Sequence, residues 1–264
     1  MESNKENITI QIMGGLGNMM FQIATSFATS LRDNKNFYCD VNMDIVPHLH
    51  YKDYQDNILR KVSFKSKSDI NHLYNERNFS FDEIPPTTGN TELKGYFQSE
   101  KYFKDYRNEI LNLFEPNNET KNKIDVFFDS FKNKSTCSIH VRRNDYIHLT
   151  NYHHLQDIEY YKLSVDIIGN EKEFLIFSDD IKWCKENFNF IENKIFIEGF
   201  KDFEEIYLMS KCENNIIANS TFSWWGAWLN KNKNKQVIIP SKWFGVLNSN
   251  LNTDDLYCDK WIKL

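Results

Sequence analysis

Residues 7–31 read NITIQIMGGLGNMMFQIATSFATSL, and this segment decides the fold. Its first seven residues alternate in polarity and are rich in β-branched side chains, which predicts a strand over 7–13. A cluster of glycines follows, and the apolar run after it has the spacing of a helix over 18–31. Residues 36–41 (NFYCDV) have the composition of a second strand. A strand, a glycine-rich loop, a helix and another strand are the opening of a doubly wound parallel sheet.

The second half of the chain continues this alternation of strands and helices. The expected elements are strand 135–141, helix 157–168, strand 173–177, helix 181–188, strand 194–197, helix 202–211, strand 214–218, helix 221–230 and strand 236–239. Such alternation predicts a parallel sheet that is covered by helices on both faces. The pattern between Pro47 and Pro86 predicts no definite element.

Two α/β lobes are the expected domain organisation. The polar residues Lys132-Asn133-Lys134 mark the predicted division, which gives an N-terminal lobe over 1–133 and a C-terminal lobe over 134–264. We expect a ligand between the lobes, beyond the carboxyl ends of the strands, because open α/β sheets bind ligands there.

Composition excludes several classes of protein. The 264 residues are 41% hydrophobic, which is enough to build a core, and the net charge of −5 offers no positive field for nucleic acid. The five cysteines are an odd number without a CxxC pair, so we expect reduced, buried thiols and neither disulfides nor a cysteine zinc site. No stretch has the roughly 18–20 apolar residues that cross a bilayer. Because Met1–Asn7 is polar and unlike a signal peptide, a cytoplasmic protein is predicted.

The motif HVRRND at 140–145 follows a predicted strand and carries the strongest chemical signal. Only six residues are arginine against 26 lysines, and two of the six are adjacent here. A guanidinium binds a diphosphate with two parallel hydrogen bonds, which a lysine cannot do. Alternation along the strand predicts that His140 and Arg142 share one face and that Arg143 points elsewhere. The alternative is a structural ion pair between Arg143 and Asp145.

The glycines Gly14, Gly15 and Gly17, followed by Asn18, would let backbone N–H groups approach a phosphate or a sugar. A purely structural tight turn is one alternative. A dinucleotide fingerprint with Asp40 as the ribose-binding acid is another. Met20 stands at the third glycine position of that fingerprint, where a side chain would obstruct the packing of helix on strand.

Asp179 and Asp180 follow another predicted strand and have three possible uses. Asp179 could cap the next helix. A carboxylate could accept hydrogen bonds from the N1 and amino donors of guanine. Both acids could hold a divalent metal with a diphosphate, although the arginines already supply positive charge.

Residues 219–228 (NSTFSWWGAW) begin a helix after a predicted strand. Free N–H groups and hydroxyls at a helix start form an anion site, so Ser220 and Thr221 are candidate phosphate contacts. Either residue acting only as an N-cap is the alternative. The three tryptophans have helical spacing, which is more typical of a core than of a sugar platform.

As a set, these motifs resemble the α-1,2-fucosyltransferase family of bacterial and animal enzymes. The matching segments are GGLGNMMFQIA (14–24), GYFQSEKYF (95–103), HVRRNDY (140–146), FSDDIKWCKENF (177–188) and NSTFSWWGAWL (219–229). The resemblance implies a GT-B-like fold with two Rossmann-like lobes, the first on the acceptor side and the second binding GDP-fucose. It implies GDP-fucose as co-substrate, with no metal and no other cofactor.

The resemblance also assigns roles to individual residues. It implies that His140 and Asp180 contact the guanosine and that Arg142 contacts the diphosphate. Ser220, Thr221 and Ser223 would lie near the phosphates. Asn18 would face the fucose or its phosphate.

The implied reaction inverts C1, because the donor is a β-fucoside of GDP and the family product is an α linkage. Arg142 would stabilise the charge that develops on the leaving phosphate. Asp145 is our first candidate for the general base because it lies beside the arginines, although their charge would make it a poorer base. An acid from the N-terminal lobe is an equal alternative.

The implied acceptor is a terminal β-galactoside at its 2-hydroxyl. A lipid-linked acceptor glycan would favour loose attachment at the inner face of the membrane. The nearer alternative is the same fold with another sugar acceptor or another nucleotide-sugar donor. An NAD-dependent oxidoreductase that uses Gly15, Gly17 and Asp40 and a non-catalytic carbohydrate-binding protein are more remote alternatives.

Overall fold

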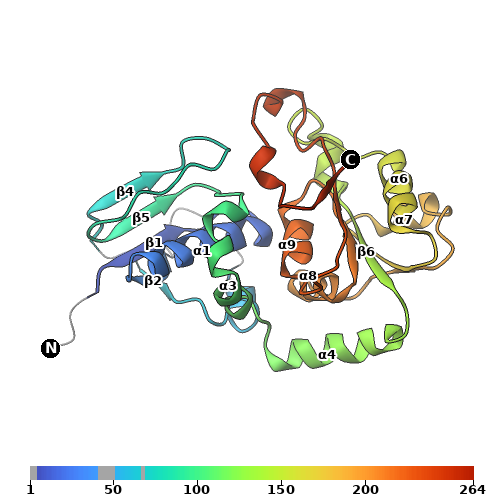
Figure 1. The fold of residues 1–264 in the computed structure, drawn as a ribbon, viewed down its shortest axis with the longest axis horizontal. Coiled ribbons are helices and arrows are strands. Elements are labelled where there is room, and N and C mark those ends of the chain that lie inside the picture. The colour runs from blue at the N-terminus through green and yellow to red at the C-terminus, as the bar shows by residue number, and fades with distance from the viewer. Residues whose placement is uncertain (1–4, 41–50, 67–68) are drawn as a thin grey trace. The chain divides into compact units, whose positions relative to one another are not determined.

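The computed structural model describes residues 5–40, 51–66 and 69–264, and the chain divides into two compact units (Figure 1). The first unit comprises Met1–Asn117 and Asn252–Leu256. The second comprises Asn118–Leu251 and Tyr257–Leu264. The chain therefore returns briefly to the first unit near its C-terminus.

The first unit is a parallel sheet in the order β3-β2-β1-β5-β4. Its elements are β1 (Asn7–Gln11), α1 (Leu16–Arg32), β2 (Asn36–Asp40), α2 (Lys52–Gln55), β3 (Phe64–Lys65), β4 (His72–Asn75), β5 (Thr91–Lys94), α3 (Arg107–Leu113) and the 3₁₀ turns Glu100–Tyr102, Lys104–Tyr106 and Asp254–Leu256. The central strand β1 has β2 on one side and β5 on the other. The chain adds β2 and β3 on one side of β1 and then crosses over to add β4 and β5 on the other side, so the strand order reverses between β1 and β5, which is the switch point of this sheet.

The connection between β4 and β5 is irregular, although parallel neighbours usually need a crossover helix. Side chains from the end of α1 hold it in place. Arg32 donates to the carbonyl oxygens of Ile84 and Pro85, and Asp33 accepts from the N–H and the hydroxyl of Thr87. These side-chain hydrogen bonds fix the connection, which has no internal helical hydrogen bonds to do so.

The second unit is a parallel sheet in the order β11-β10-β9-β6-β7-β8. Its elements are α4 (Asn118–Phe128), β6 (Thr136–Val141), α5 (Asn144–His148), α6 (Ile158–Ile168), β7 (Glu173–Ser178), α7 (Ile181–Asn187), β8 (Lys194–Phe196), α8 (Asp202–Lys211), β9 (Asn214–Ile216), α9 (Thr221–Leu229), β10 (Val237–Ile239), β11 (Ile262–Lys263) and the 3₁₀ turns Asp129–Phe131 and Val246–Asn248. Counted along the chain, this is the strand order 3-2-1-4-5-6 of the Rossmann fold. Its switch point lies between β6 and β9.

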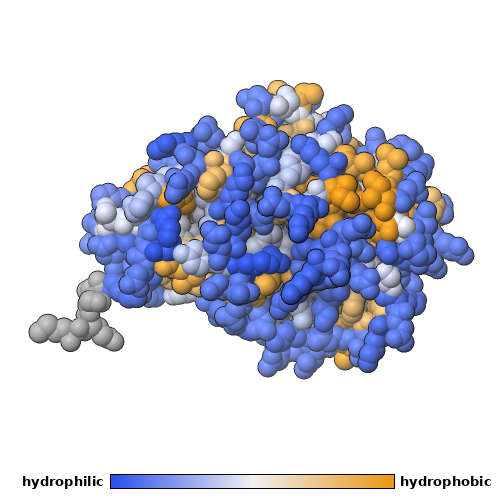
Figure 2. Space-filling model, in the orientation of Figure 1, coloured by the Kyte–Doolittle hydropathy of each residue, from blue (hydrophilic) through white to orange (hydrophobic). Residues whose placement is uncertain are grey.

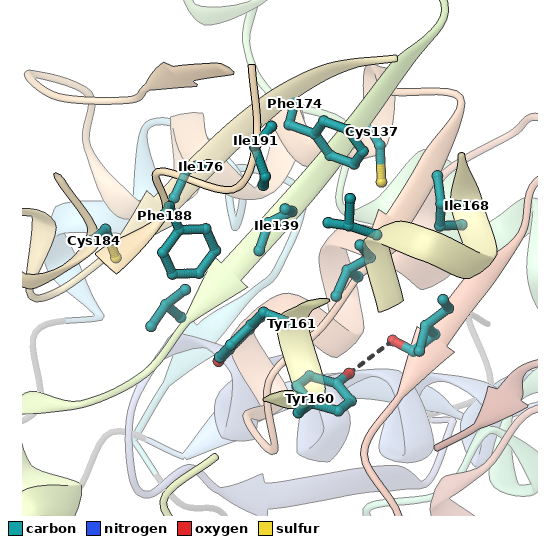
Figure 3. Packing of buried hydrophobic residues seen from close by; sticks show 14 residues of the cluster. Cys137, Ile139, Tyr160, Tyr161, Ile168, Phe174, Ile176, Cys184, Phe188 and Ile191 are labelled. Carbon is teal, nitrogen blue, oxygen red and sulfur yellow. Dashed lines mark hydrogen bonds between the residues drawn. The ribbon is translucent and has the colours of Figure 1, made fainter. Parts of the chain in front are cut away.

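Both faces of the second sheet are buried, as the alternation along β7 demonstrates. Phe174 and Ile176 belong to a hydrophobic cluster with Tyr161 of α6 and Cys184 of α7 (Figure 3). Their neighbours along the strand, such as Leu175, belong to a second cluster that includes residues of α4 and α8. Helices therefore cover the sheet on both sides, which explains why its strands are continuous apolar runs.

Every strand and helix that the sequence predicted between residues 135 and 239 is present, with boundaries that differ by at most two residues from those in the structure, whereas α4, α5 and β11 were not predicted. The predicted division near Lys132–Lys134 differs from the observed one, which follows Asn117. The reason is that α4 packs on the second unit: Ile124 is fully buried in a cluster with Leu208 and Met209 of α8. The predicted end of the second strand at Val41 lies outside the described residues.

Helix α9 is buried along most of its length, which confirms the core reading of its tryptophans. Trp224 and Trp225 are fully buried, and Trp228 is 2% exposed. Gly226 faces α8, where a Cβ atom would lie 2.8 Å from Cβ of Met209. The absence of a side chain at Gly226 therefore sets how closely α8 and α9 approach.

Gly226→Ala should lower the free energy of unfolding by about 1–3 kcal/mol, because the added methyl group overlaps Met209 in a packed core. Urea unfolding of the purified variant would measure the loss. Met209→Ala removes the sulfur atom that would lie 2.9 Å from the new methyl group, so in the double variant the cost should be smaller than the sum of the two single costs. Strict additivity would mean that the two residues do not share this contact.

Candidate functional site

The carboxyl end of β6 lies at the switch point of the second sheet and carries the two arginines. The strand itself is buried from Thr136 to Val141, so the chain emerges from the core directly before Arg142. The end of β7 and the start of α9 supply the other candidate residues of this unit. Because parallel strands end at one edge, residues that are distant in sequence meet here.

Arg142 is held between two carboxylates. Its Nη2 lies 2.9 Å from Oδ1 of Asp145, and its Nη1 lies 3.1 Å from Oδ2 of Asp179. The guanidinium also lies 5.6 Å from the centre of the Tyr146 ring. Burial opposes the charge, but the two acids raise the pKa of Arg142 above its ordinary value. The result is a permanent cation at the switch point.

Arg143 turns towards α7 and makes a separate set of contacts. Its guanidinium lies 3.8 Å from the centre of the Trp183 ring, and its Nε donates to Oδ2 of Asp180 at 3.2 Å. Its backbone N–H donates to Asp179. The hypothesis of an Arg143–Asp145 ion pair was wrong, because Asp145 pairs with Arg142 and Arg143 pairs with Asp180.

Asp180 caps helix α7, whereas the sequence suggested Asp179 for this role. Oδ1 of Asp180 accepts from the N–H of Trp183 at 3.1 Å and caps α7. Asp179, the residue that the sequence suggests as the cap, instead forms an ion pair with Arg142 and accepts from the N–H of Arg143. Asp179 therefore ties the arginine loop to the end of β7.

His140 lies on β6 and is 5% exposed. Its ring is 5.3 Å from that of Phe222 in α9, and its Nδ1 has no hydrogen-bond partner among the described residues. Burial, together with the charge of Arg142, lowers the pKa of His140 to about 3. The imidazole is therefore neutral at physiological pH, and one ring nitrogen can accept a hydrogen bond.

The start of α9 presents hydroxyls and backbone N–H groups. Ser220 occupies the N-cap position, but its side chain makes no capping hydrogen bond. Ser223 is fully buried, and its hydroxyl donates to the carbonyl oxygen of Ser220 at 3.3 Å. Ser220 is therefore the N-cap residue by position, but its side chain does not cap the helix. Thr221 is the first residue of the helix.

Asn219 organises this edge of the sheet, a role that sequence reasoning missed. Its amide donates to the carbonyl oxygens of His154 and Trp243, and it accepts from Gln156. The hydroxyl of Tyr146 donates to the Asn219 carbonyl oxygen at 2.9 Å. The signal in the sequence was an asparagine directly before a helix start that is rich in hydroxyl groups. These bonds join the loop before α9 to the ring beneath Arg142.

The glycine-rich loop of the first unit lies between β1 and α1. Gly14 has φ +79°, and a Cβ atom there would lie 2.7 Å from Nδ2 of Asn18. Asn18 accepts a hydrogen bond at 3.0 Å from Gln98, which follows β5 on the other side of the switch point. Gly15 is the N-cap residue of α1, and Gly17 lies in the first turn of that helix. Gln98 was not predicted as a site residue, although it lies in the family-like segment GYFQSEKYF.

Within the parts of the chain that the structure describes, no group of three or more His, Cys, Asp or Glu side chains could hold a metal ion. All five cysteines are free and buried, as predicted. Figure 2 shows a surface that is largely hydrophilic with separate hydrophobic patches. No helix in residues 5–40, 51–66 and 69–264 is long and apolar enough to span a membrane.

Comparison with known proteins identifies the family. The model of glycosyl transferase family 11 matches residues 1–264. The chain belongs to glycosyl transferase family 11. A relative within the curated proteins is the "Alpha-1,2-colitosyltransferase" of Escherichia coli, which is 29% identical over 97% of this chain and 98% of its own length.

Two further matches extend the comparison for this family 11 chain. "Galactoside alpha-(1,2)-fucosyltransferase 2" of Sus scrofa is 25% identical over 84% of this chain and 69% of its own length. The crystal structure of NodZ alpha-1,6-fucosyltransferase with GDP has a TM-score of 0.56 at 12% identity, and the match covers 85% of this chain and 92% of NodZ. The fold is therefore that of the GT-B fucosyltransferases, with two parallel sheets flanked by helices.

His140 should make the stability of this glycosyltransferase depend on pH. Because the folded state lowers the pKa of His140 to about 3, the unfolded chain binds this proton more tightly. The contribution of neutral His140 to the free energy of unfolding is complete above the ordinary pKa of 6.5 and is lost as pH falls towards 3. His140→Gln should therefore reduce the loss of unfolding free energy between about pH 7.5 and about pH 5 by about 2 kcal/mol.

Urea unfolding at several pH values would measure this difference between His140→Gln and the unmodified protein. Identical pH slopes would contradict a neutral, buried His140. NMR titration of the His140 ring gives an independent check, since its resonances should show no protonation step between about pH 5 and about pH 8.

Proposed function

We propose that this glycosyltransferase moves L-fucose from GDP-β-L-fucose to the 2-hydroxyl of a terminal β-galactoside, with inversion at C1 and without a metal ion. The observation that carries the proposal is the permanent cation Arg142, held by two carboxylates at the switch point of a Rossmann sheet. A guanidinium fork at that place suits a nucleoside diphosphate.

Family membership supports glycosyl transfer over the alternatives of an NAD-dependent oxidoreductase and a non-catalytic carbohydrate-binding protein. The name of the pig relative supports a galactoside acceptor and an α-1,2 linkage. The GDP in the NodZ crystals supports a guanosine diphosphate donor. The second unit supplies a cation at Arg142, hydroxyls at the start of α9 and a hydrogen-bond acceptor at His140, and these groups have the chemistry that such a donor requires.

Stabilisation of the leaving group is the main chemical task. As the C1–O bond to the β-phosphate breaks, negative charge grows on the phosphate and the sugar becomes oxocarbenium-like. Arg142 is assigned to that charge, and the N-terminus of α9 adds N–H groups and the hydroxyls of Ser220 and Thr221 as donors. Ser223 is buried and supports the helix start by donating to the carbonyl oxygen of Ser220. A diphosphate that binds Arg142 competes with Asp145, which is the more exposed of its two acidic partners.

The remaining donor contacts are assigned to the base and the sugar. Neutral His140 can accept a hydrogen bond from the guanosine, and Asp180 is assigned to the same group. Asp179 supports the site through Arg142. Asn18 is assigned to the fucose or its phosphate. Gly14, Gly15 and Gly17 have no side chains and so let the backbone beside Asn18 approach the same group.

A donor that carries colitose is the second candidate, because the E. coli colitosyltransferase matches nearly the whole chain. Colitose is the 3-deoxy counterpart of fucose, so the two donors differ by one hydroxyl group. A site built to hydrogen-bond that hydroxyl rejects the deoxy sugar strongly, whereas an apolar site discriminates weakly. Relative kcat/KM values for the two donors would decide between them.

The test of the function is incubation with GDP-fucose and lactose in excess EDTA, followed by GDP release and NMR of the product. An α-1,2-fucosylated trisaccharide is the expected product. GDP release without this product would support the donor but mean that the acceptor is not the 2-hydroxyl of a β-galactoside. No turnover together with no binding of GDP by calorimetry would contradict the proposal.

Arg142→Ala should lower kcat by about 100- to 1000-fold, because one charge-stabilising contact to the leaving group is lost. Arg142→Lys keeps the charge but loses the fork, so only part of the activity should return. Single-turnover kinetics with GDP-fucose would measure both. Unchanged turnover in Arg142→Ala would rule out the phosphate role.

Asp145→Asn tests the proposed general base. Its carboxylate is partly exposed and forms an ion pair with Arg142, so deprotonation of an acceptor hydroxyl requires that pair to open. As a base it should contribute about 100-fold or more, and the asparagine variant should lose the acidic limb of the pH–rate profile. A pH–rate profile like that of the unmodified enzyme would remove Asp145 from this role.

A further inference from the structure

The turn that follows β5 contains an energetically unfavourable backbone conformation. Phe97 has φ +52°, which is rare for a bulky side chain, yet the residue is fully buried. Such a conformation costs on the order of 1–3 kcal/mol and persists only where the surroundings enforce it. Sites with this property concentrate where function requires a defined geometry.

Glu76 is the residue that enforces the turn. It follows β4, and its carboxylate accepts hydrogen bonds from two consecutive N–H groups, those of Tyr96 at 2.7 Å and Phe97 at 2.9 Å. Its own N–H donates to the carbonyl oxygen of Lys94. A Cβ atom on Gly95 would overlap the Glu76 side chain, so the glycine is what admits the carboxylate to this place.

Aromatic packing supports the same conformation from the side-chain end. The ring of Phe97 lies 5.3 Å from that of Tyr102, edge to face, and 6.4 Å from that of Tyr74. Burial raises the pKa of Glu76, although the N–H groups of Phe97 and Tyr96 act in the opposite direction. A carboxylate thus occupies a position that burial makes unfavourable for its charge, and its two backbone bonds are the visible compensation.

The next residue in the chain connects this turn to the reaction. Gln98 is 8% exposed, and its Nε2 donates to Oδ1 of Asn18 at 3.0 Å. That bond determines which end of the Asn18 amide is the acceptor and which is the donor. The direction of Gln98 depends on the left-handed turn immediately before it.

We propose that Glu76 is a positioning residue for fucosyl transfer: it holds the strained turn at Phe97 so that Gln98 orients the amide of Asn18. The inference rests on the proposed function, because Asn18 is assigned there to the fucose or its phosphate. Glu76 itself touches backbone N–H groups and acts through Gln98.

Glu76→Gln is the first variant, since a neutral amide has one acceptor oxygen and turns N–H donors towards the second backbone N–H. We expect kcat to fall by about 10- to 100-fold, as expected when a reacting group is misplaced by about 1 Å. Glu83→Gln, an exposed residue of the same connection, is the matched control and should retain the kcat of the unmodified enzyme. Glu76→Asp keeps the charge and should lose less, which gives a second variant if Glu76→Gln folds poorly.

A double-variant cycle separates positioning from general destabilisation. Gln98→Met removes the bond to Asn18, so Glu76→Gln should change kcat by less than about 3-fold when Gln98 is already methionine. If the kcat of the double variant fell by the product of the two single-variant losses, the proposal would be overturned, because Glu76 would then act by another route than Gln98.

Side-chain amide NMR provides a readout that does not depend on turnover. The Asn18 and Gln98 amide resonances should shift in Glu76→Gln and stay in place in Glu83→Gln. Unshifted resonances in Glu76→Gln would overturn the positioning role. If the unmodified protein transfers no fucose but these resonances shift as expected, the proposed function fails while the Glu76-dependent orientation of Asn18 holds.

Discussion

Parallel strand pairing is the constraint on which both units depend. Every ladder between described strands within a sheet is parallel, so the carboxyl ends of neighbouring strands lie at one edge. Where the connections diverge, that edge opens into a crevice between two strands. The end of β6 and the start of α9 meet at the switch point in the second unit, and the ends of β1 and β5 meet in the first. Arg142 therefore contacts Asp179, and Tyr146 bonds the carbonyl oxygen of Asn219, although long segments separate these residues in sequence.

The charge balance at Arg142 follows from this geometry. Asp179 is anchored by the N–H of Arg143 and has a side chain that is 18% exposed, whereas the side chain of Asp145 is 46% exposed. One partner is thus part of the scaffold, and the other can return to water at small cost. An anionic ligand can replace Asp145 at the guanidinium without leaving a buried charge unpaired. The same reasoning explains why a permanent cation is tolerated at the edge of a hydrophobic sheet.

Residues that contact no substrate in the proposed reaction also determine the geometry of the candidate site residues in each unit. Asn219 joins three loops at the carboxyl edge of the second sheet, and Glu76 holds the turn that precedes Gln98. Both use an amide or a carboxylate in a setting where unmade hydrogen bonds would be costly. Networks of this kind restrict side chains to one orientation, which is what selective binding of a sugar nucleotide requires.

The sequence by itself determined the alternation of strands and helices, the glycine loop, the arginine pair at a strand end and the family, because these depend on short-range periodicity and on residue types with few chemical uses. It also identified the buried tryptophans, since their helical spacing is local. Only the tertiary structure decided which acid pairs with which arginine, because Asp179 and Asp180 reach Arg142 and Arg143 through the pairing of β6 with β7. It likewise decided that α4 belongs to the second unit, and that Gln98 meets Asn18 across 80 residues. Contacts of that range depend on strand order, which no local pattern specifies.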